Sequence, residues 1–320
     1  MSSITKALNE TTNAQGGFLV PEEWSNQLLA LVTTNTVFVP DLDMRKMATD
    51  VQYIPKSTSG TTAYWVGETG AVTESQPGFG QITLSAKKVA SLVYASSEVL
   101  EDNNVELANG LVNDMARDIG IAIDSAIFAG TGAPWYGLRT TNSFTNAVDG
   151  GGNVGAIGAD GTGSSITGGA ITWQVISKAK TEVLKDNHVN ADTSYWAPRT
   201  FGSLQLLTDG NARPIWNMET FGSPLLREGV LATVLGTRAK PSNTMPTNYS
   251  YGTTAALSGA CSDNLVGISK QFAILGNRRN FIWKTDYFIT GDYYAWQTTA
   301  RMGFAVKYPD AYCMIRGITN

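Results

Sequence analysis

Apolar and polar residues alternate along the segment 47–95, which is the pattern of half-buried β-strands. The alternating apolar positions fall into three groups: Val51, Tyr53, Pro55; Thr62, Tyr64, Val66; and Ile82, Leu84, Ala86. Turn-forming residues at 57–60 and 76–80 separate these groups. A further apolar run at 89–95 leads into the sequence SSEVLED, which predicts the start of a helix. The segment is therefore expected to be an extended β-arm followed by a helix.

The arm has too few apolar residues to form a core of its own. An isolated two-stranded arm is only marginally stable in water. The stretch 63–102 must therefore lie against the rest of this chain or against another copy of it. The first case would make the protein a self-contained domain, and the second would make it an assembly subunit.

A long helix is predicted at about 104–128. Its apolar positions recur every four residues: Leu107, Leu111, Met115, Ile119, Ile123 and Ile127. Asn103 and Glu106 have the spacing of a capping box at its start. A helix of about 25 residues spans roughly 37 Å, long enough to be the backbone of a domain. Asp114, Asp118 and Asp124 are predicted to lie on its polar side, facing solvent or another subunit.

The remaining chain divides into less regular parts. A short helix is expected at 22–32, after Pro21 and a polar lead, and another at about 171–186. The glycine-rich stretch 149–169 predicts a long surface loop. Alternating residues in the last 45 positions predict strands, among them Phe304, Val306 and the series Ala311, Cys313, Ile315.

Composition narrows the function classes. The chain has 320 residues, 42% hydrophobic and 16% charged, with a net charge of −4. A mildly acidic chain without a run of five basic residues is not built for general adhesion to nucleic acid or anionic membranes. No apolar run reaches the roughly 20 residues of a membrane span, and the N-terminus lacks the apolar region of a secretory signal.

Residues for familiar catalytic or metal sites are scarce. Cys261 and Cys313 are the only cysteines, without CxxC spacing, so they are predicted to be buried thiols made in a reducing compartment; a disulfide between them stays open. His188 is the only histidine and is expected at a helix end or on the surface. The sequence contains no HExxH, phosphate-binding loop or GxSxG motif. We therefore expect no enzyme activity, no cofactor and no metal.

Six short motifs, in order along nearly the whole chain, resemble those of the phage major capsid proteins of the HK97-fold family. They are GGFLVPEEWS at 16–25, WVGE at 65–68, the segment 79–102 with its KK pair and SEVLED, GTGAPWYGL at 130–138, LGTRAKPSNTMP at 235–246, and the closing strand 301–317 with PDA. Each motif is weak alone. Their shared order carries the resemblance.

The resemblance implies an α+β fold with an extended hairpin called the E-loop. The expected parts are an N-terminal arm and first helix (1–46), the E-loop (47–88), a P domain with a long spine helix (89–172), an A domain (173–275), and the C-terminal strands of the P domain (276–320). The E-loop is expected to lie over a neighbouring subunit, which would give the arm its missing core. Packing of the hairpin within its own chain is the alternative for Trp65 and Glu68.

The same resemblance implies what the protein assembles with. Contacts between subunits are expected at Phe18, Lys56, Tyr64, Trp65, Glu68, Phe79, Lys87 and Lys88. The chain would form the hexamers and pentamers of an icosahedral virion shell around double-stranded DNA, which it would hold non-specifically. A scaffolding protein, a portal and decoration proteins are the further expected partners, with assembly in the host cytoplasm and no membrane involved.

Two departures from the family pattern affect these expectations. Only 15 residues precede Gly16, so scaffolding is expected either as a separate protein or as a segment already removed. Some members join subunits through an isopeptide bond between a lysine and an asparagine, helped by a glutamate. Here Lys56 stands near the lysine position, while Asp292 and Thr299 fall at the other two. Because Asp has no amide to displace and Thr is a poor proton acceptor, we expect no covalent crosslink.

Two other functions compete with this interpretation. A compartment shell of the encapsulin type shares the fold but encloses enzymes, and neighbouring genes would distinguish it. A soluble hydrolase or glycan-binding domain could use the eight tryptophans in an aromatic cleft. A monomeric elution peak would favour that second alternative.

Overall fold

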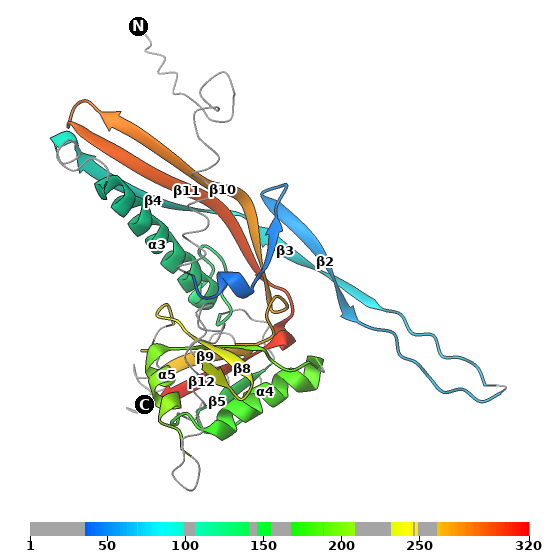
Figure 1. The fold of residues 1–320 in the computed structure, drawn as a ribbon. Helices are drawn as coiled ribbons and strands as arrows, with labels where there is room; N and C mark the ends of the chain where they lie inside the picture. The colour runs from blue at the N-terminus through cyan, green and yellow to red at the C-terminus, as the bar shows by residue number, and fades with distance from the viewer. Residues whose placement is uncertain are drawn as a thin grey trace. The chain divides into compact units, whose positions relative to one another are not determined.

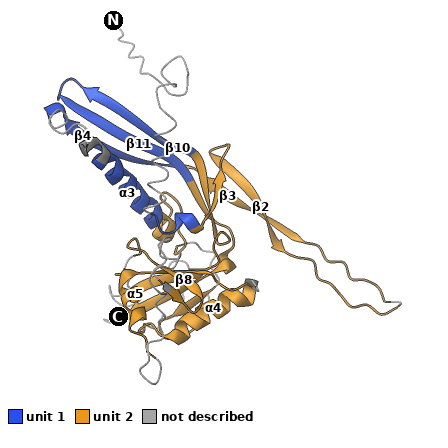
Figure 2. Ribbon diagram, viewed as in Figure 1, with its two compact units in different colours: residues 1–40, 87–125, 279–302 blue, residues 41–86, 126–278, 303–320 orange. Residues whose placement is uncertain are grey.

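A computed structural model gives the fold (Figure 1). The structure describes residues 36–68, 70–98, 106–140, 146–154, 168–187, 189–208, 232–245, 247–248 and 261–319. The chain divides into two compact units (Figure 2). Unit 1 comprises residues 1–40, 87–125 and 279–302, and unit 2 comprises 41–86, 126–278 and 303–320. The predicted helix at 22–32, Phe18, Asn103 and His188 lie outside the described residues.

Unit 1 contains most of the long helix α3 (Glu106–Ala129). This helix confirms the prediction at 104–128. Its buried residues come in adjacent pairs one turn apart, namely 115/116, 119/120, 123/124 and 127/128. Met115, Ile119 and Ile123 fill one column of this face, as the four-residue spacing predicted.

Three strands of unit 1 lie beside α3: β4 (Lys87–Ser96) and parts of β10 (Ala273–Phe288) and β11 (Tyr293–Val306) (Figure 2). They belong to a four-stranded sheet in the order β1-β10-β11-β4, which places β4 at its edge. Burial alternates along β4, since Val89, Ser91, Val93 and Ala95 are half-buried. The opposite residues Lys88, Ala90, Leu92, Tyr94 and Ser96 are exposed. We call the side that carries the exposed residues the open face.

The core of unit 2 is a mixed sheet of six strands in the order β5-β12-β9-β6-β8-β7. These strands are β5 (Ala147–Asp149), β12 (Tyr312–Thr319), β9 (Cys261–Gly267), β6 (Thr193–Trp196), β8 (Thr237–Pro241) and β7 (Ala232–Val234). Helices α4 (Trp173–Asn187) and α5 (Pro198–Gln205) accompany the sheet. The apolar face of α4 packs on it through Val175, Ile176, Ala179 and Val183. The helix predicted at 171–186 is therefore confirmed.

The inner strand β12 is buried on both of its faces, whereas the sequence predicted that buried and exposed residues would alternate along it. Residues 312–318 are all buried, including Met314, which lies between Cys313 and Ile315. The strand has β9 on one side and β5 on the other, so its backbone is hydrogen-bonded at both edges. A strand covered on both faces reads as a continuous apolar run and not as an alternating one.

The remaining short elements lie partly or wholly in unit 2. The 3₁₀ turn η2 (Val39–Asp41), which begins in unit 1, leads into β1 (Asp43–Lys46), which pairs in parallel with β10 at 274–277. A second 3₁₀ turn, η5 (Pro309–Ala311), precedes β12. Asp41 is buried, and its Oδ2 accepts hydrogen bonds from the hydroxyl of Tyr195 and from Nζ of Lys240, the latter at 2.8 Å. The ion pair joins η2 to β8, and the hydrogen bond from Tyr195 joins it to β6.

The position of Asp124 on α3 contradicts its predicted place on the polar side. Its side chain is 1% exposed and accepts hydrogen bonds from the backbone N–H groups of Val37 (2.6 Å) and Phe38 (3.4 Å). Burial raises its pKa to about 7, although the two hydrogen bonds oppose that shift. Asp114 and Asp118 are exposed as predicted, and both lie 3.5 Å from Arg117.

Candidate functional site

The arm in unit 2 begins with the antiparallel hairpin of β2 (Val51–Ser59) and β3 (Gly78–Ser85). Its register places Ile54 opposite Ile82 and Gln52 opposite Leu84. Ile54, Ile82 and Leu84 are buried against Met47 and Ile274, so this base has a small core within the chain. The other face of the hairpin exposes Val51, Tyr53 and Phe79.

The loop between these strands, residues 60–77, has no strand among its described residues, so the strand predicted from Thr62, Tyr64 and Val66 is wrong. Its two sides are joined at Thr62 and Ser75, whose hydroxyl accepts from the Thr62 N–H at 3.0 Å. A turn closes the far end, where the Gly70 N–H donates to the Gly67 carbonyl at 3.0 Å. The bonds described within the loop are thus local, and its large apolar side chains are exposed.

The predicted residues of the loop are strongly exposed. Trp65 is 105% exposed, and Tyr64, Val66 and Val72 are between 40% and 79% exposed. Glu68 is exposed beside the turn at the far end. Several large apolar groups exposed to water along one loop are typical of a surface that becomes buried in an assembly.

Lys56 and Phe79 lie nearer the base of the same arm. Lys56 pairs with Gly80 and is half-buried, while Phe79 pairs with Ser57 and is 77% exposed. The structure therefore brings Lys56, Tyr64, Trp65, Glu68 and Phe79 together on one arm. Their contacts with other subunits remain predictions.

The predicted residues Lys87 and Lys88 lie in unit 1, at the start of β4. Lys88 is directly opposite Arg301 of β11, and directly opposed residues share a face of the sheet. Thr299, on the same face, accepts a hydrogen bond from Arg279 of β10 at 3.0 Å. We call Lys88, Arg279 and Arg301 the basic group of the open face.

Sequence reasoning missed Arg279, Arg301, Leu92 and Tyr94 as parts of this surface. Leu92 and Tyr94 are 47% and 58% exposed on the open face. The alternation of apolar residues predicted the strands correctly, but it could not show which face of the sheet is exposed. The pair Lys87 and Lys88 was the sequence signal that this surface is basic, and only the β4–β11 register shows that Arg301 belongs to it.

The residues at the crosslink positions are engaged in other contacts. The Tyr287 hydroxyl donates to Oδ1 of Asp292 at 2.7 Å, and hydrogen bonds from Ser97 and Tyr287 lower the pKa of Asp292. Asp292 has a positive φ of 49° in the turn between β10 and β11. Thr299 is 3% exposed and bound to Arg279. Asp292, at the asparagine position, has no amide to be displaced, and Thr299, at the glutamate position, is a buried hydroxyl that accepts protons poorly.

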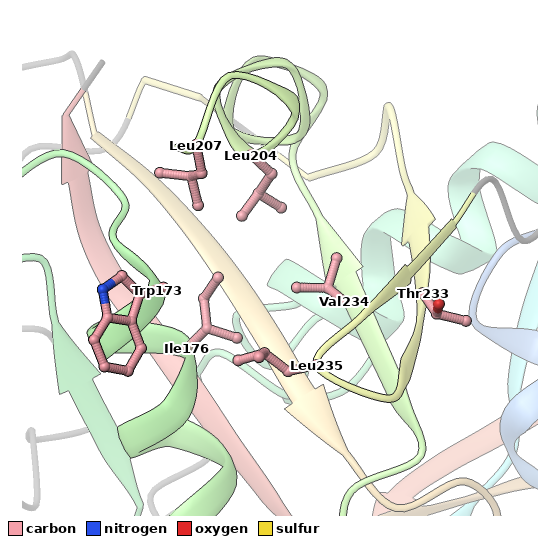
Figure 3. Close-up of a pocket in the computed structure, with 7 residues that line it drawn as sticks. All are labelled: Trp173, Ile176, Leu204, Leu207, Thr233, Val234 and Leu235. Atoms are coloured by element: carbon pink, nitrogen blue, oxygen red, sulfur yellow. The ribbon is translucent and has the colours of Figure 1, made fainter. Parts of the chain in front are cut away.

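An apolar hollow on unit 2 is lined by seven residues (Figure 3): Trp173, Ile176, Leu204, Leu207, Thr233, Val234 and Leu235. Its polar side-chain groups are the hydroxyl of Thr233 and the indole N–H of Trp173 (Figure 3). None of these residues can act as an acid, a base or a metal ligand. The hollow therefore gives no support to hydrolase chemistry.

Two further observations concern the described part of the chain. It contains no group of three His, Cys, Asp or Glu side chains able to hold a metal ion. Within it, no helix has the length and apolar character needed to cross a bilayer. Cys261 and Cys313 are both buried and free in the structure, which confirms their predicted burial.

A hairpin arm, a long helix beside a sheet and a separate sheet domain were all expected from the capsid resemblance. The sequence profile of the phage capsid family matches residues 16–317. The chain belongs to the phage capsid family. Its members are shell proteins, so the chain is a structural component of a virion, and the encapsulin alternative is not favoured.

Solved structures share the fold of this chain, and one curated relative is similar to part of it. The capsid of an empty GTA particle is similar with a TM-score of 0.62 and 17% identity, over 98% of this chain and 100% of that one. A Microbacterium phage Oxtober96 structure is similar with a TM-score of 0.60 and 15% identity, over 88% of this chain and 90% of that one. These likenesses show an HK97-like fold. The major capsid protein of Halomonas phage phiHAP-1 is 24% identical over 124 residues, which are 38% of this chain and 20% of that protein.

Proposed function

We propose that this chain is the major capsid subunit of a tailed double-stranded DNA phage and that it assembles into the hexamers and pentamers of an icosahedral shell. The shell would enclose the genome through non-specific contacts. A scaffolding protein, a portal and decoration proteins would be its partners during and after assembly in the host cytoplasm. Its role is mechanical, without catalysis or covalent joining of subunits.

The observation that carries the proposal is the exposure of Trp65 at the end of a long arm. Burial of a tryptophan removes about 200 Å² from water, worth roughly 5 kcal/mol before the cost of ordering the loop. Among its described neighbours, Tyr64, Val66 and Val72 are also exposed. A neighbouring subunit would bury this set, and the gain would recur at every subunit of a closed symmetric shell.

The charge of the chain agrees with this role. A net charge of −4 gives the wall little general affinity for packaged DNA. The similar GTA capsid was solved with C5 symmetry, as expected for a shell that has pentameric vertices. The proposal extends that arrangement to this chain.

Sedimentation and electron microscopy of the purified full chain test the proposal. We expect closed shells, or hexameric and pentameric rings that convert to shells as the protein concentration rises. A species that remains monomeric at every concentration, with and without a co-expressed scaffolding protein, would refute it.

A further inference from the structure

The hollow of unit 2 combines buried and exposed apolar side chains (Figure 3). Ile176 of α4, Leu204 of α5 and Val234 of β7 are buried. Trp173 of α4 is 50% exposed, and Leu235, which follows β7, is 43% exposed. None of the seven lining residues is charged. Large apolar groups that remain in water beside a concave surface are typical of a place where a partner binds.

Leu235 stands at a backbone position that leucine disfavours. Its φ is 48° and that of Gly236 is 78°, the values of a type I′ turn, and the two residues join β7 to β8. Asparagine or aspartate followed by glycine is the preferred pair in such a turn, because few other side chains tolerate a left-handed φ. Leucine is therefore unfavourable here both for its backbone and for its exposure. A strained residue that lines a concave surface points to a role in binding.

A positive charge lies beside the same turn. Lys180 is one helical turn after Ile176 on α4, and its Nζ donates a hydrogen bond to the carbonyl of Leu235. Partial burial lowers the pKa of Lys180. No carboxylate of the described residues pairs with Lys180, whereas Lys185 of the same helix pairs with Glu182. The amine of Lys180 is therefore placed to receive a carboxylate from a ligand.

The edge of the sheet beside the hollow presents backbone groups outward. In the described part of the chain, β7 is the last strand of the six-stranded sheet and pairs with β8 alone. The pair Val234 and Thr237 closes the two-residue turn and is hydrogen-bonded, so the next pair, Thr233 and Arg238, is not. The Arg238 N–H accordingly donates to the Asp192 carbonyl at 2.8 Å. The N–H and C=O of Thr233 therefore point to the outer edge of β7, where an extended peptide can pair with them.

We propose that the hollow, the outer edge of β7 and Lys180 together bind an extended peptide segment of a partner protein. A large apolar side chain of the peptide enters the hollow against Trp173 and Leu235. The peptide backbone pairs with Thr233, and a carboxylate of the peptide binds Lys180. In an extended peptide, residues two positions apart share a face and are about 7 Å apart. This spacing is close to the rise of about 6 Å from Ile176 to Lys180, so the peptide carries its acidic residue two positions from its apolar one.

Fluorescence polarisation with a labelled synthetic peptide tests the inference on the unassembled full chain. The probe is TTFTDTT, and two control peptides replace its phenylalanine by serine or its aspartate by asparagine. The probe should bind about fivefold more tightly than the asparagine peptide, the size expected for one partly exposed ion pair. The serine peptide should not bind. Lys180→Gln should abolish the preference for aspartate, whereas Lys185→Gln, the matched control on the same helix, should keep it.

Leu235→Asn separates binding from folding. Asparagine suits the left-handed position, so this variant should keep or raise the midpoint of urea unfolding. It should nevertheless weaken probe binding by about fivefold or more, because the hollow loses an apolar wall. Three results would each overturn the inference: a wild type that does not bind the probe, Leu235→Asn that binds it as tightly as the wild type, or Lys180→Gln that still prefers aspartate.

Other occupants of the hollow give distinct results. Decanoate that binds where the probe does not would assign the hollow to a small amphiphile. A probe affinity that falls as the chain concentration rises would assign it to a second copy. Both outcomes overturn the inference. It goes beyond the proposed function, because binding is measured on unassembled chains, so a failure of either proposal leaves the other intact.

Discussion

The carboxylate of Asp124 lies 2.6 Å from the backbone nitrogen of Val37, although 86 residues separate the two along the chain. The contact fixes the segment before η2 to the long helix within unit 1. A buried carboxylate that accepts two backbone N–H groups satisfies donors that would otherwise be costly to bury.

This contact predicts an unusual pH dependence of stability. The pKa of Asp124 rises from 3.8 to about 7 on folding, so the folded chain holds a proton between these values that the unfolded chain does not. The contribution to stability is therefore full below about pH 4 and is lost as the pH rises through about 7, by roughly 4 kcal/mol in total. Asp124→Asn should lack this change, since its side chain does not titrate.

Urea unfolding of the full chain at pH 5 and pH 8 measures the effect. The wild type should lose stability relative to Asp124→Asn as the pH rises. A constant difference between the two proteins would show that Asp124 does not titrate in this range.

Gly276 and Leu84 should be energetically coupled at the base of the arm. A Cβ at Gly276 would lie 2.4 Å from Cδ2 of Leu84 and 2.6 Å from Sδ of Met47. Gly276→Ala should therefore cost about 1–3 kcal/mol by overpacking, and Leu84→Ala about 2–5 kcal/mol by leaving a cavity. Leu84→Ala gives room to the new methyl group, so the double variant should lose clearly less than the sum.

The control for this pair is Gly202→Ala in α5, where an added Cβ meets nothing within 4 Å. That change should stabilise the chain slightly, because alanine favours the helix. Urea unfolding measures all four variants. Strict additivity at Gly276 and Leu84 would contradict the predicted clash.

Trp65→Ala should separate assembly from folding. Since Trp65 is fully exposed in the single chain, its removal should leave the thermal unfolding midpoint of unassembled subunits unchanged, while the yield of shells falls sharply. Trp196→Ala, at a fully buried site in β6, should instead lower the midpoint. Normal shell yield from Trp65→Ala would contradict an intersubunit role for this side chain.

Intact particles should contain no covalent ladder. Asp292 carries no amide, and Thr299 is buried beside Arg279, so the positions that matched the isopeptide site lack its chemistry. A denaturing gel of purified shells should show a single band at the mass of the monomer. Shells treated with a bifunctional crosslinker provide the positive control, and pentamers or hexamers in untreated shells would disprove the prediction.

The long helix α3 and the sheet strands could be predicted from the sequence because their periodicity reports local geometry. Met115, Ile119 and Ile123 occupy the predicted apolar column. Asp124 could not be assigned, because its partners Val37 and Phe38 are distant in sequence. Its position one turn after the buried Gly120 was the available signal, but a carboxylate there is read first as solvent-facing.

In the loop 60–77 the sequence pattern predicted a regular element that the structure does not have. Thr62, Tyr64 and Val66 alternate like a strand, yet no strand forms at these positions. Alternation indicates which residues avoid water, and it does not specify what covers them. In this chain the cover proposed for Trp65 belongs to a second copy, so the sequence of one copy gives the need for a contact but not its location.

The two thiols bear on how a finished particle would survive outside its host. Cys261 and Cys313 lie on the neighbouring strands β9 and β12, and burial raises the pKa of both. Peroxide, including that formed in aerated buffer, attacks the exposed thiolate form, which these sites suppress. Prolonged storage in air should therefore leave both sulfurs intact and the shell free of oxidative ageing at its cysteines.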